Sequence, residues 1–163
     1  MIIILLINTG IVPRFCEELF QTIAHRQQGE SVTFEVKFSM LEIYNEAVRD
    51  LLNPASLASK KAGLKVREHP TKGFFAEGLK QFMVTSQKNI EAKIEEGTTN
   101  RSIASTNMNE TSSRAHTIVS IYISQKTKNA QGVESAKTSN VNLVDLAGRL
   151  VPVCRLSEIR LDY

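Results

Sequence analysis

The feature that most constrains the fold is the segment VNLVDLAG at residues 141–148, in which a strand-like apolar run ends in Asp-x-x-Gly. At the carboxyl edge of an α/β sheet, this pattern presents the Asp145 carboxylate and the Gly148 N–H where such sheets bind ligands. The carboxylate can hold a Mg²⁺-bound water, and the glycine N–H can face a terminal phosphate. Because many buried strands end in Asp before a glycine turn, this segment alone is a weak indication of a nucleotide site.

A second segment, the polar NETSSRAH at residues 109–116, has side chains suited to the same chemistry. Ser112 and Ser113 carry small hydroxyls that both donate and accept, so they can reach a phosphate oxygen and a metal-bound water. The Asn109 amide can donate to a phosphate oxygen, and the forked donors of Arg114 suit a carboxylate across the site. The alternative is a polar turn with local backbone bonds and a solvated Arg114. Together, NETSSRAH and VNLVDLAG favour a nucleotide site over a polar turn.

Five segments, these two among them, resemble the kinesin motor domain family and follow the family's order. They resemble the helix after the phosphate-binding helix, the central strand with its E-I-Y-N-E motif and following helical turn, the small lobe that contacts tubulin, the helix leading into the first nucleotide switch, and the second switch. The third segment is most similar to vesicle-carrying kinesins. In chain order the segments read GIVPRFCEELF, VTFEVKFSMLEIYNEAVRDLLNP, LKVREHPTKGFFAEGL, SQKNIEAKIEEGTTNRSIASTNMNETSSRAH and NLVDLAG.

The resemblance implies a partial P-loop NTPase fold of the α/β class, with a mixed central sheet flanked by helices and truncated at both ends. Residues 10–148 would form the partial motor domain, and residues 1–9 and 149–163 would be tails unrelated to the family. The implied parent activity is ATP hydrolysis coupled to movement along microtubules, in the cytoplasm and on the cytoskeleton. The implied partner is tubulin, without nucleic acid or direct membrane insertion, and any dimer would form through regions outside this chain.

The resemblance also assigns roles to single residues, with ATP and Mg²⁺ as the cofactors of the family. It implies that Asn109, Ser112 and Ser113 bind the nucleotide, that Ser113 and Asp145 hold Mg²⁺ through a bound water, and that Arg114, Asp145 and Gly148 carry the catalytic and sensing roles. A basic turn could contact acidic tubulin, or could equally be a solvated surface; its members are Lys65, Arg67, His69 and Lys72.

Two departures from the family limit what this chain is expected to do alone. The only Gly-x-x-x-x-Gly spacing match to a phosphate-binding loop runs from Gly73 to Gly78, where Leu79 occupies the Lys position. That match lies in the segment that resembles the tubulin-contacting lobe, so we interpret it as a decoy. Kinesins continue after the second switch with Ser-Glu, whereas Arg149 and Leu150 stand here. We therefore expect the chain to be inactive on its own. The alternatives to a motor-domain function are a non-catalytic fragment that at most binds tubulin or a motor partner, and a non-functional truncated product.

Composition is that of an ordinary globular domain and does not identify a partner. The chain has 163 residues, 42% apolar and 23% charged, with a net charge of +3. Cys16 and Cys154 are too far apart in the sequence for a metal motif and make no disulfide framework, so we expect reduced thiols. The apolar run at residues 2–7 is too short to span a membrane as a helix.

Three isolated side chains are expected to be structural. His116 is expected to be a hydrogen-bonded residue. Glu42 and Glu46 are expected to belong to a structural motif, although paired carboxylates can perform acid–base chemistry.

Residue periodicity predicts the order of helices and strands. The predicted elements are a helix from Pro13 that stops at Gly29, a long strand from Val32 with a bulge or a change of burial near Met40, a short helix at residues 45–52, short strands at residues 64–68 and 74–77, a helix capped by Ser86 with Gly97 past its end, and an antiparallel hairpin built from strands at residues 117–124 and 141–145.

Overall fold

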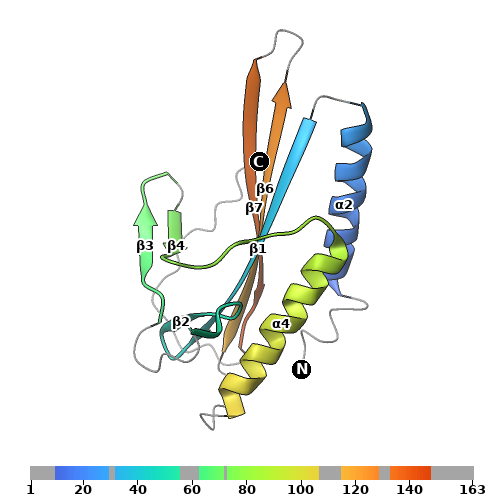
Figure 1. The fold of residues 1–163 in the computed structure, drawn as a ribbon. Helices are drawn as coiled ribbons and strands as arrows, with labels where there is room; N and C mark the ends of the chain where they lie inside the picture. The colour runs from blue at the N-terminus through green and yellow to red at the C-terminus, as the bar shows by residue number, and fades with distance from the viewer. Residues whose placement is uncertain are drawn as a thin grey trace.

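In a computed structural model, the structure describes residues 10–29, 32–55, 63–71, 73–106, 115–128 and 133–147. The main sheet has the strand order β2-β1-β6-β7, with β5 also paired to β1, and β3 and β4 form a separate two-stranded sheet (Figure 1). The elements are α2 (Ile11–Gly29), β1 (Val32–Tyr44), β2 (Ala47–Asp50), β3 (Val66–His69), β4 (Gly73–Ala76), β5 (Phe82–Met83), α4 (Gln87–Thr106), β6 (His116–Lys128) and β7 (Glu134–Asp145).

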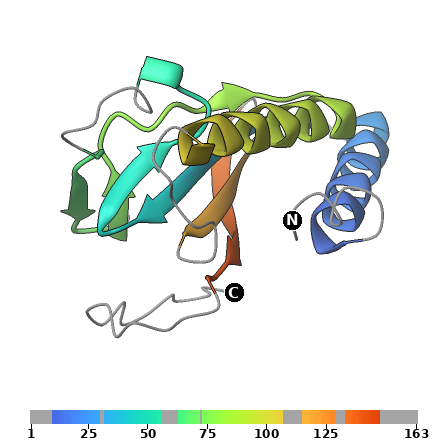
Figure 2. The same ribbon diagram turned by 90° about the horizontal axis from the view of Figure 1, so that it is seen from below.

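Helices α2 and α4 lie on the same face of the main sheet (Figures 1 and 2). Their apolar side chains meet those of β1 and β6 in one core, which includes Ile23 of α2, Phe38 of β1, Ile90 of α4 and Ile121 of β6. Removing such side chains from water is the main favourable term in folding. The core therefore fixes both helices on the sheet. Among the described residues, no helix is long and apolar enough to cross a membrane.

Strand β1 is continuous through the change of pattern near Met40. Its pairing with β6 runs without interruption from Val32 opposite Thr127 to Ile43 opposite His116, so there is no bulge in this ladder. Instead Phe38, Ser39 and Met40 are buried in succession. Of the two alternatives for this position, the change of burial is the one that the structure contains.

The helix predicted at residues 45–52 is wrong, because this segment forms the tight hairpin between β1 and β2. Tyr44 pairs with Ala47 across a two-residue turn, and the turn residues Asn45 and Glu46 have φ values of 47° and 64°. Positive φ at both central residues matches the twist of flanking strands in the favoured two-residue hairpin turn. The alternating burial of β2, with Val48 buried, outweighs the helical propensity of the segment.

The prediction that Gly97 lies past the end of its helix is also wrong, since α4 continues to Thr106. Gly97 is buried, and a Cβ atom there would lie 2.5 Å from the Met40 Sδ and 3.6 Å from the Leu51 Cβ. The glycine therefore allows α4 to approach β1 closely. A glycine near a predicted helix end can serve packing instead of termination.

The other predicted elements agree with the structure. The hairpin of β6 and β7 is antiparallel, and both strands extend further than predicted, from Thr117 opposite Asp145 to Lys128 opposite Glu134. The short strands β3 and β4 are antiparallel as well. The parallel pairings that would complete a mixed sheet do not occur among the strands of the described ranges.

Candidate functional site

The β6–β7 hairpin brings the described ends of the two segments, residues 115–116 and 141–147, to one edge of the sheet. Thr117, near the start of β6, pairs with Asp145, at the end of β7. Just beyond this pair, the Ala147 N–H donates a hydrogen bond of 3.1 Å to the His116 Nδ1. His116 directly follows the Asn-x-x-Ser-Ser-Arg-Ala sequence, and Ala147 directly precedes Gly148. One hydrogen bond thus joins the described end of the first segment to the described end of the second.

Among the predicted nucleotide-site residues, the structure describes Asp145, which is half-buried at this edge. The other members lie outside the described residues: Asn109, Ser112, Ser113, Arg114 and Gly148. The structural role expected for His116 is confirmed by its hydrogen bond to Ala147. Because Nδ1 accepts that bond, the proton of the neutral imidazole lies on Nε2.

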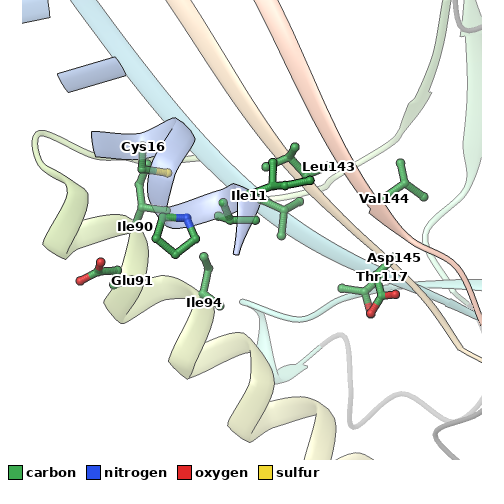
Figure 3. A pocket seen from close by; sticks show the side chains of 12 residues that line it. Ile11, Cys16, Ile90, Glu91, Ile94, Thr117, Leu143, Val144 and Asp145 are labelled. Carbon is green, nitrogen blue, oxygen red and sulfur yellow. The ribbon is translucent and has the colours of Figure 1, made fainter. Parts of the chain in front are cut away.

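A cavity of about 160 Å³ lies behind this edge, between the start of α2, the first half of α4, the start of β6 and the end of β7 (Figure 3). Thr117 and Asp145 lie together at one end of the cavity, and Cys16 and Ile90 lie at the other. The Thr117 hydroxyl is buried and has no hydrogen-bond partner among the residues that the structure describes. The full lining is Ile11, Val12, Pro13, Cys16, Ile90, Glu91, Ile94, Thr117, Val119, Leu143, Val144 and Asp145.

The thiol of Cys16, which lines this cavity, is unreactive at neutral pH. Burial, and next the nearby Glu91 carboxylate, raise the pKa of the Cys16 thiol to about 11. The reactive form of cysteine is the thiolate, which is scarce at neutral pH when the pKa is that high. Cys16 therefore acts as a small apolar side chain of the core.

The polar end of the cavity fits a weakly held Mg²⁺ better than a metal cage. The described residues contain no group of three or more His, Cys, Asp or Glu side chains that could hold a metal ion. Mg²⁺ is commonly bound through one or two carboxylates together with water and substrate phosphates. A single carboxylate, Asp145, at the open edge of the sheet is compatible with that mode of binding.

The E-I-Y-N-E motif forms a buried ion-pair cluster that joins β1, β2 and α4. Glu42 is 5% exposed, and its Oε1 accepts a bond of 3.0 Å from the Arg101 Nε. The Arg49 Nη1 lies 4.0 Å from the Glu42 Oε2, and the Arg49 guanidinium lies 5.4 Å from the centre of the Tyr44 ring. The structural role predicted for Glu42 is confirmed. Neither arginine partner was predicted. Arg101 lies 59 residues away in the sequence, and Arg49 lies opposite Glu42 because residues 45–50 form a hairpin and not the predicted helix.

A second buried carboxylate, which no local sequence pattern indicates, holds the chain where β2 ends. Asp50 is 0% exposed and accepts two backbone bonds of 2.9 Å, at Oδ1 from the Leu52 N–H and at Oδ2 from the Lys80 N–H. The Asn100 side chain of α4 donates a 2.7 Å bond to the Leu51 carbonyl. Together these bonds tie β2, the segment before β5 and α4 to one another.

Comparison with known proteins identifies the family. The sequence profile of the kinesin motor domain matches residues 6–150. The chain belongs to the kinesin motor domain family. It is 49% identical over 140 residues to the kinesin-like protein KIF13A of Mus musculus, a match that covers 85% of this chain and 8% of that protein. It is 48% identical over 141 residues to the kinesin-like protein KIF28 of Rattus norvegicus, covering 86% of this chain and 13% of that protein.

Comparison of the fold with solved structures indicates the same family. A solved structure of a fast kinesin superposes with a TM-score of 0.74 and 34% sequence identity, over 92% of this chain and 40% of that chain. The structure of that kinesin has implications for its ATPase mechanism and its interactions with microtubules. The chain thus has the fold of part of a kinesin motor domain, and it spans a small part of the relatives that it matches.

The segment that resembles the tubulin-contacting lobe of kinesins forms the β3–β4 hairpin beside the main sheet (Figure 1). Lys65, Arg67 and His69 are exposed there, while Lys72 lies outside the described residues. The Arg67 Nε is 3.0 Å from the Glu77 Oε2, and the His69 Nδ1 accepts a 3.2 Å bond from the Thr71 N–H. Of the basic side chains described here, Arg67 therefore has its charge paired within the hairpin.

The Gly73–Gly78 spacing match is part of this hairpin, as the decoy interpretation requires. Gly73 begins β4 and Gly78 lies in the turn after it, with φ values of 73° and 81°. Between them the chain is largely an extended strand paired with β3. A phosphate-binding loop instead wraps its N–H groups around a bound anion.

Proposed function

We propose that the edge formed by the start of β6 and the end of β7 is the nucleotide-sensing edge of a motor domain that hydrolyses ATP and moves along microtubules in the cytoplasm. The observation that supports the proposal is the hydrogen bond between Ala147 and His116, the described residues that flank Gly148 and the sequence of residues 109–114 in the chain. The proposal also rests on membership of the kinesin motor domain family.

In this proposal the predicted site residues divide the binding of metal and phosphate among them. Bound Mg²⁺ would neutralise phosphate charge. Asp145 and Ser113 would orient water on the metal, the Gly148 N–H would face the terminal phosphate, and Arg114 would pair with a carboxylate when the site closes. Asn109 and Ser112 would donate to phosphate oxygens.

The His116–Ala147 bond would make the two predicted switch segments respond together to the bound nucleotide. A segment ordered by phosphate contacts in one nucleotide state and released in another is a known switching mode. Because His116 and Ala147 are bonded to each other, a contact that orders the segment before His116 would restrain the segment after Ala147 as well. The His116–Ala147 bond would therefore couple the two switches.

The first test concerns Asp145 in the 163-residue chain. We expect millimolar affinity for MgATP, and we expect Asp145→Asn to weaken it on the order of fivefold, because a charge-assisted contact through metal-bound water is lost. Without Mg²⁺ the variant and the parent chain should bind ATP equally. The affinity is measured by ³¹P NMR titration.

The matched control for this test is Glu95→Gln, an equivalent change at an exposed position of α4. It should leave the affinity unchanged. Equal MgATP affinity of the parent chain and Asp145→Asn would contradict the role of Asp145. Micromolar affinity of the parent chain would contradict the expectation that this sequence has no phosphate-binding loop.

A second proposed function is direct microtubule contact by the β3–β4 hairpin, and it does not need the nucleotide edge. The exposed charge of Lys65 and the exposed ring of Phe74, at 62%, lie on this projecting hairpin. Basic side chains attract acidic surfaces and lose that attraction as salt rises. We therefore infer a weak, salt-sensitive interaction between the hairpin and tubulin.

Co-sedimentation with microtubules at low salt tests this interaction. We expect Lys65→Glu to reduce the bound fraction at least about threefold, because attraction becomes repulsion at the contact. Lys88→Glu makes the same change on the exposed surface of α4 and should have a smaller effect. Equal binding of the parent chain and both variants would contradict a contact through this hairpin.

A further inference from the structure

The two faces of the β3–β4 hairpin differ in charge. Side chains alternate between the faces along a strand, and residues directly opposite one another on neighbouring strands share a face. The register places Arg67 opposite Phe75, and the Glu77 N–H donates a 2.8 Å bond to the Lys65 carbonyl one pair further along. The odd-numbered side, which we call the basic face, holds Lys65, Arg67, His69, Phe75 and Glu77. The even-numbered side, which we call the apolar face, holds Val66, Glu68, Phe74 and Ala76.

An ion pair lies on the basic face. Of the two acids in residues 65–77, only Glu77 lies on this face, since Glu68 lies on the apolar face. The Glu77 Oε2 is 3.0 Å from the Arg67 Nε, and the side chains of Arg67 and Glu77 are 55% and 54% exposed. Glu77 is the diagonal neighbour of Arg67 across the hairpin, a separation that long side chains can bridge. The ion pair therefore follows from the register of the hairpin.

We propose that Glu77 restrains the microtubule contact of this hairpin by holding the guanidinium of Arg67. When the hairpin binds, Arg67 exchanges the Glu77 carboxylate for an acidic side chain of tubulin. The inference rests on the proposed contact between the hairpin and tubulin, and it adds a residue that limits the strength of that contact. Glu77 is an internal competitor with the same carboxylate chemistry as an acidic partner surface.

The exposure of the ion pair makes this exchange feasible. An ion pair between exposed side chains contributes little to stability, because water weakens the attraction and holding two long side chains together costs conformational entropy. Arg67 can therefore leave Glu77 without disturbing the fold. The guanidinium is permanently charged, and its forked donors suit a carboxylate from either source.

Glu77 opposes binding in two ways in this proposal, and only one of them needs Arg67. Its carboxylate holds a cation that the contact with tubulin uses, and its own negative charge repels an acidic surface. The first effect disappears when Arg67 is replaced, whereas the second remains. A comparison with and without Arg67 therefore separates the two effects.

Co-sedimentation of the 163-residue chain with microtubules at low salt measures the effect as a dissociation constant. We expect Glu77→Gln to bind about two- to fivefold more tightly than the parent chain, the range that corresponds to an exposed ion pair. Glutamine keeps the size of the side chain and removes its charge. The gain should shrink as salt is raised, because exposed charges are then screened.

Glu68→Gln is the matched control, since it removes the same charge from the same hairpin on the apolar face. It should change the affinity less than Glu77→Gln does. Circular dichroism checks that each variant keeps its secondary structure. An equal gain in both variants would mean that only the net charge of the hairpin matters, and it would overturn the role of the Arg67–Glu77 pair.

A double-mutant cycle with Arg67→Gln tests whether Glu77 acts through Arg67. In the Arg67→Gln background, Glu77→Gln should give at most about half of the gain in binding free energy that it gives in the parent chain. The same gain in both backgrounds would show that Glu77 repels tubulin without acting through Arg67, and the proposal would be wrong. No gain from Glu77→Gln in the parent chain would overturn it as well.

Lys65→Glu separates failure of this inference from failure of the microtubule contact itself. If Lys65→Glu weakens binding while Glu77→Gln has no effect, the contact stands and the restraint by Glu77 does not. If neither Lys65→Glu nor Arg67→Gln changes binding, the hairpin does not contact tubulin, and the restraint is wrong together with the contact.

Discussion

Replacing Glu42 with alanine is expected to lower the free energy of unfolding by about 3 to 5 kcal/mol, the range for breaking a buried ion pair from one side. The Glu42 carboxylate is buried, 3.0 Å from the Arg101 Nε and 4.0 Å from the Arg49 Nη1. Both arginine side chains are largely buried too, at 17% and 16% exposure. Without Glu42 these cations would lose the carboxylate that compensates them inside the fold.

Urea denaturation followed by circular dichroism measures this loss. The corresponding fall in Tm is roughly 6 to 20 °C for a chain of this length. Glu42→Gln retains an acceptor for Arg101 and loses only the charge, so its effect should be smaller. A loss below about 1 kcal/mol in Glu42→Ala would be the range of an exposed surface pair and would contradict a buried structural role.

Replacing Asp50 with alanine is expected to cost about 2 to 4 kcal/mol, because two backbone N–H groups lose their acceptor inside the protein. These are the N–H groups of Leu52 and Lys80, both 2.9 Å from the carboxylate. Asp50→Asn keeps one acceptor oxygen and should cost about half as much. The variant is compared with the parent chain by urea denaturation.

Amide hydrogen exchange distinguishes the loss of these two bonds from a general loss of stability. In Asp50→Ala the amides of Leu52 and Lys80 should both exchange faster than the change in global stability explains. In Asp50→Asn one of the two should remain protected. Unchanged exchange at both amides in Asp50→Ala would show that the carboxylate does not hold this part of the chain.

Sequence patterns predicted the elements whose signals are local. The helix that begins near Pro13, the alternating strand from Val32 and the β6–β7 hairpin each carry their periodicity within one segment, and all agree with the structure. The resemblance of five segments, which follow one another in the same order as in kinesins, predicted the family correctly. Where the period of apolar residues was clear, the type of element followed from it.

The errors arose where a distant part of the chain decides the local structure. Residues 45–52 have helical character, yet their pairing with β1 makes a strand of Ala47–Asp50. Gly97 has the composition signal of a helix end, yet its contact with Met40 explains why a glycine lies in the middle of α4. Glu42 and Arg101 are far apart in sequence, so their ion pair could not be predicted without the packing of α4 on β1.

The candidate site was predictable only in part. Sequence patterning predicted Asp145 at the end of a strand, and the structure has it there, paired with Thr117. The roles of Asn109, Ser112, Ser113, Arg114 and Gly148 stay predictions. The bond between His116 and Ala147 was not predicted, because it depends on the register of β6 against β7.

The most direct test of the nucleotide-sensing edge is a ¹H–¹⁵N NMR titration of the isotope-labelled 163-residue chain with MgATP. We expect the largest shift changes at the amides of His116, Asp145 and Ala147, with smaller changes in Asp145→Asn. Shift changes concentrated at Gly73 and Gly78, with none at the β6–β7 edge, would contradict the account and would mean that the spacing match on the hairpin is the phosphate site.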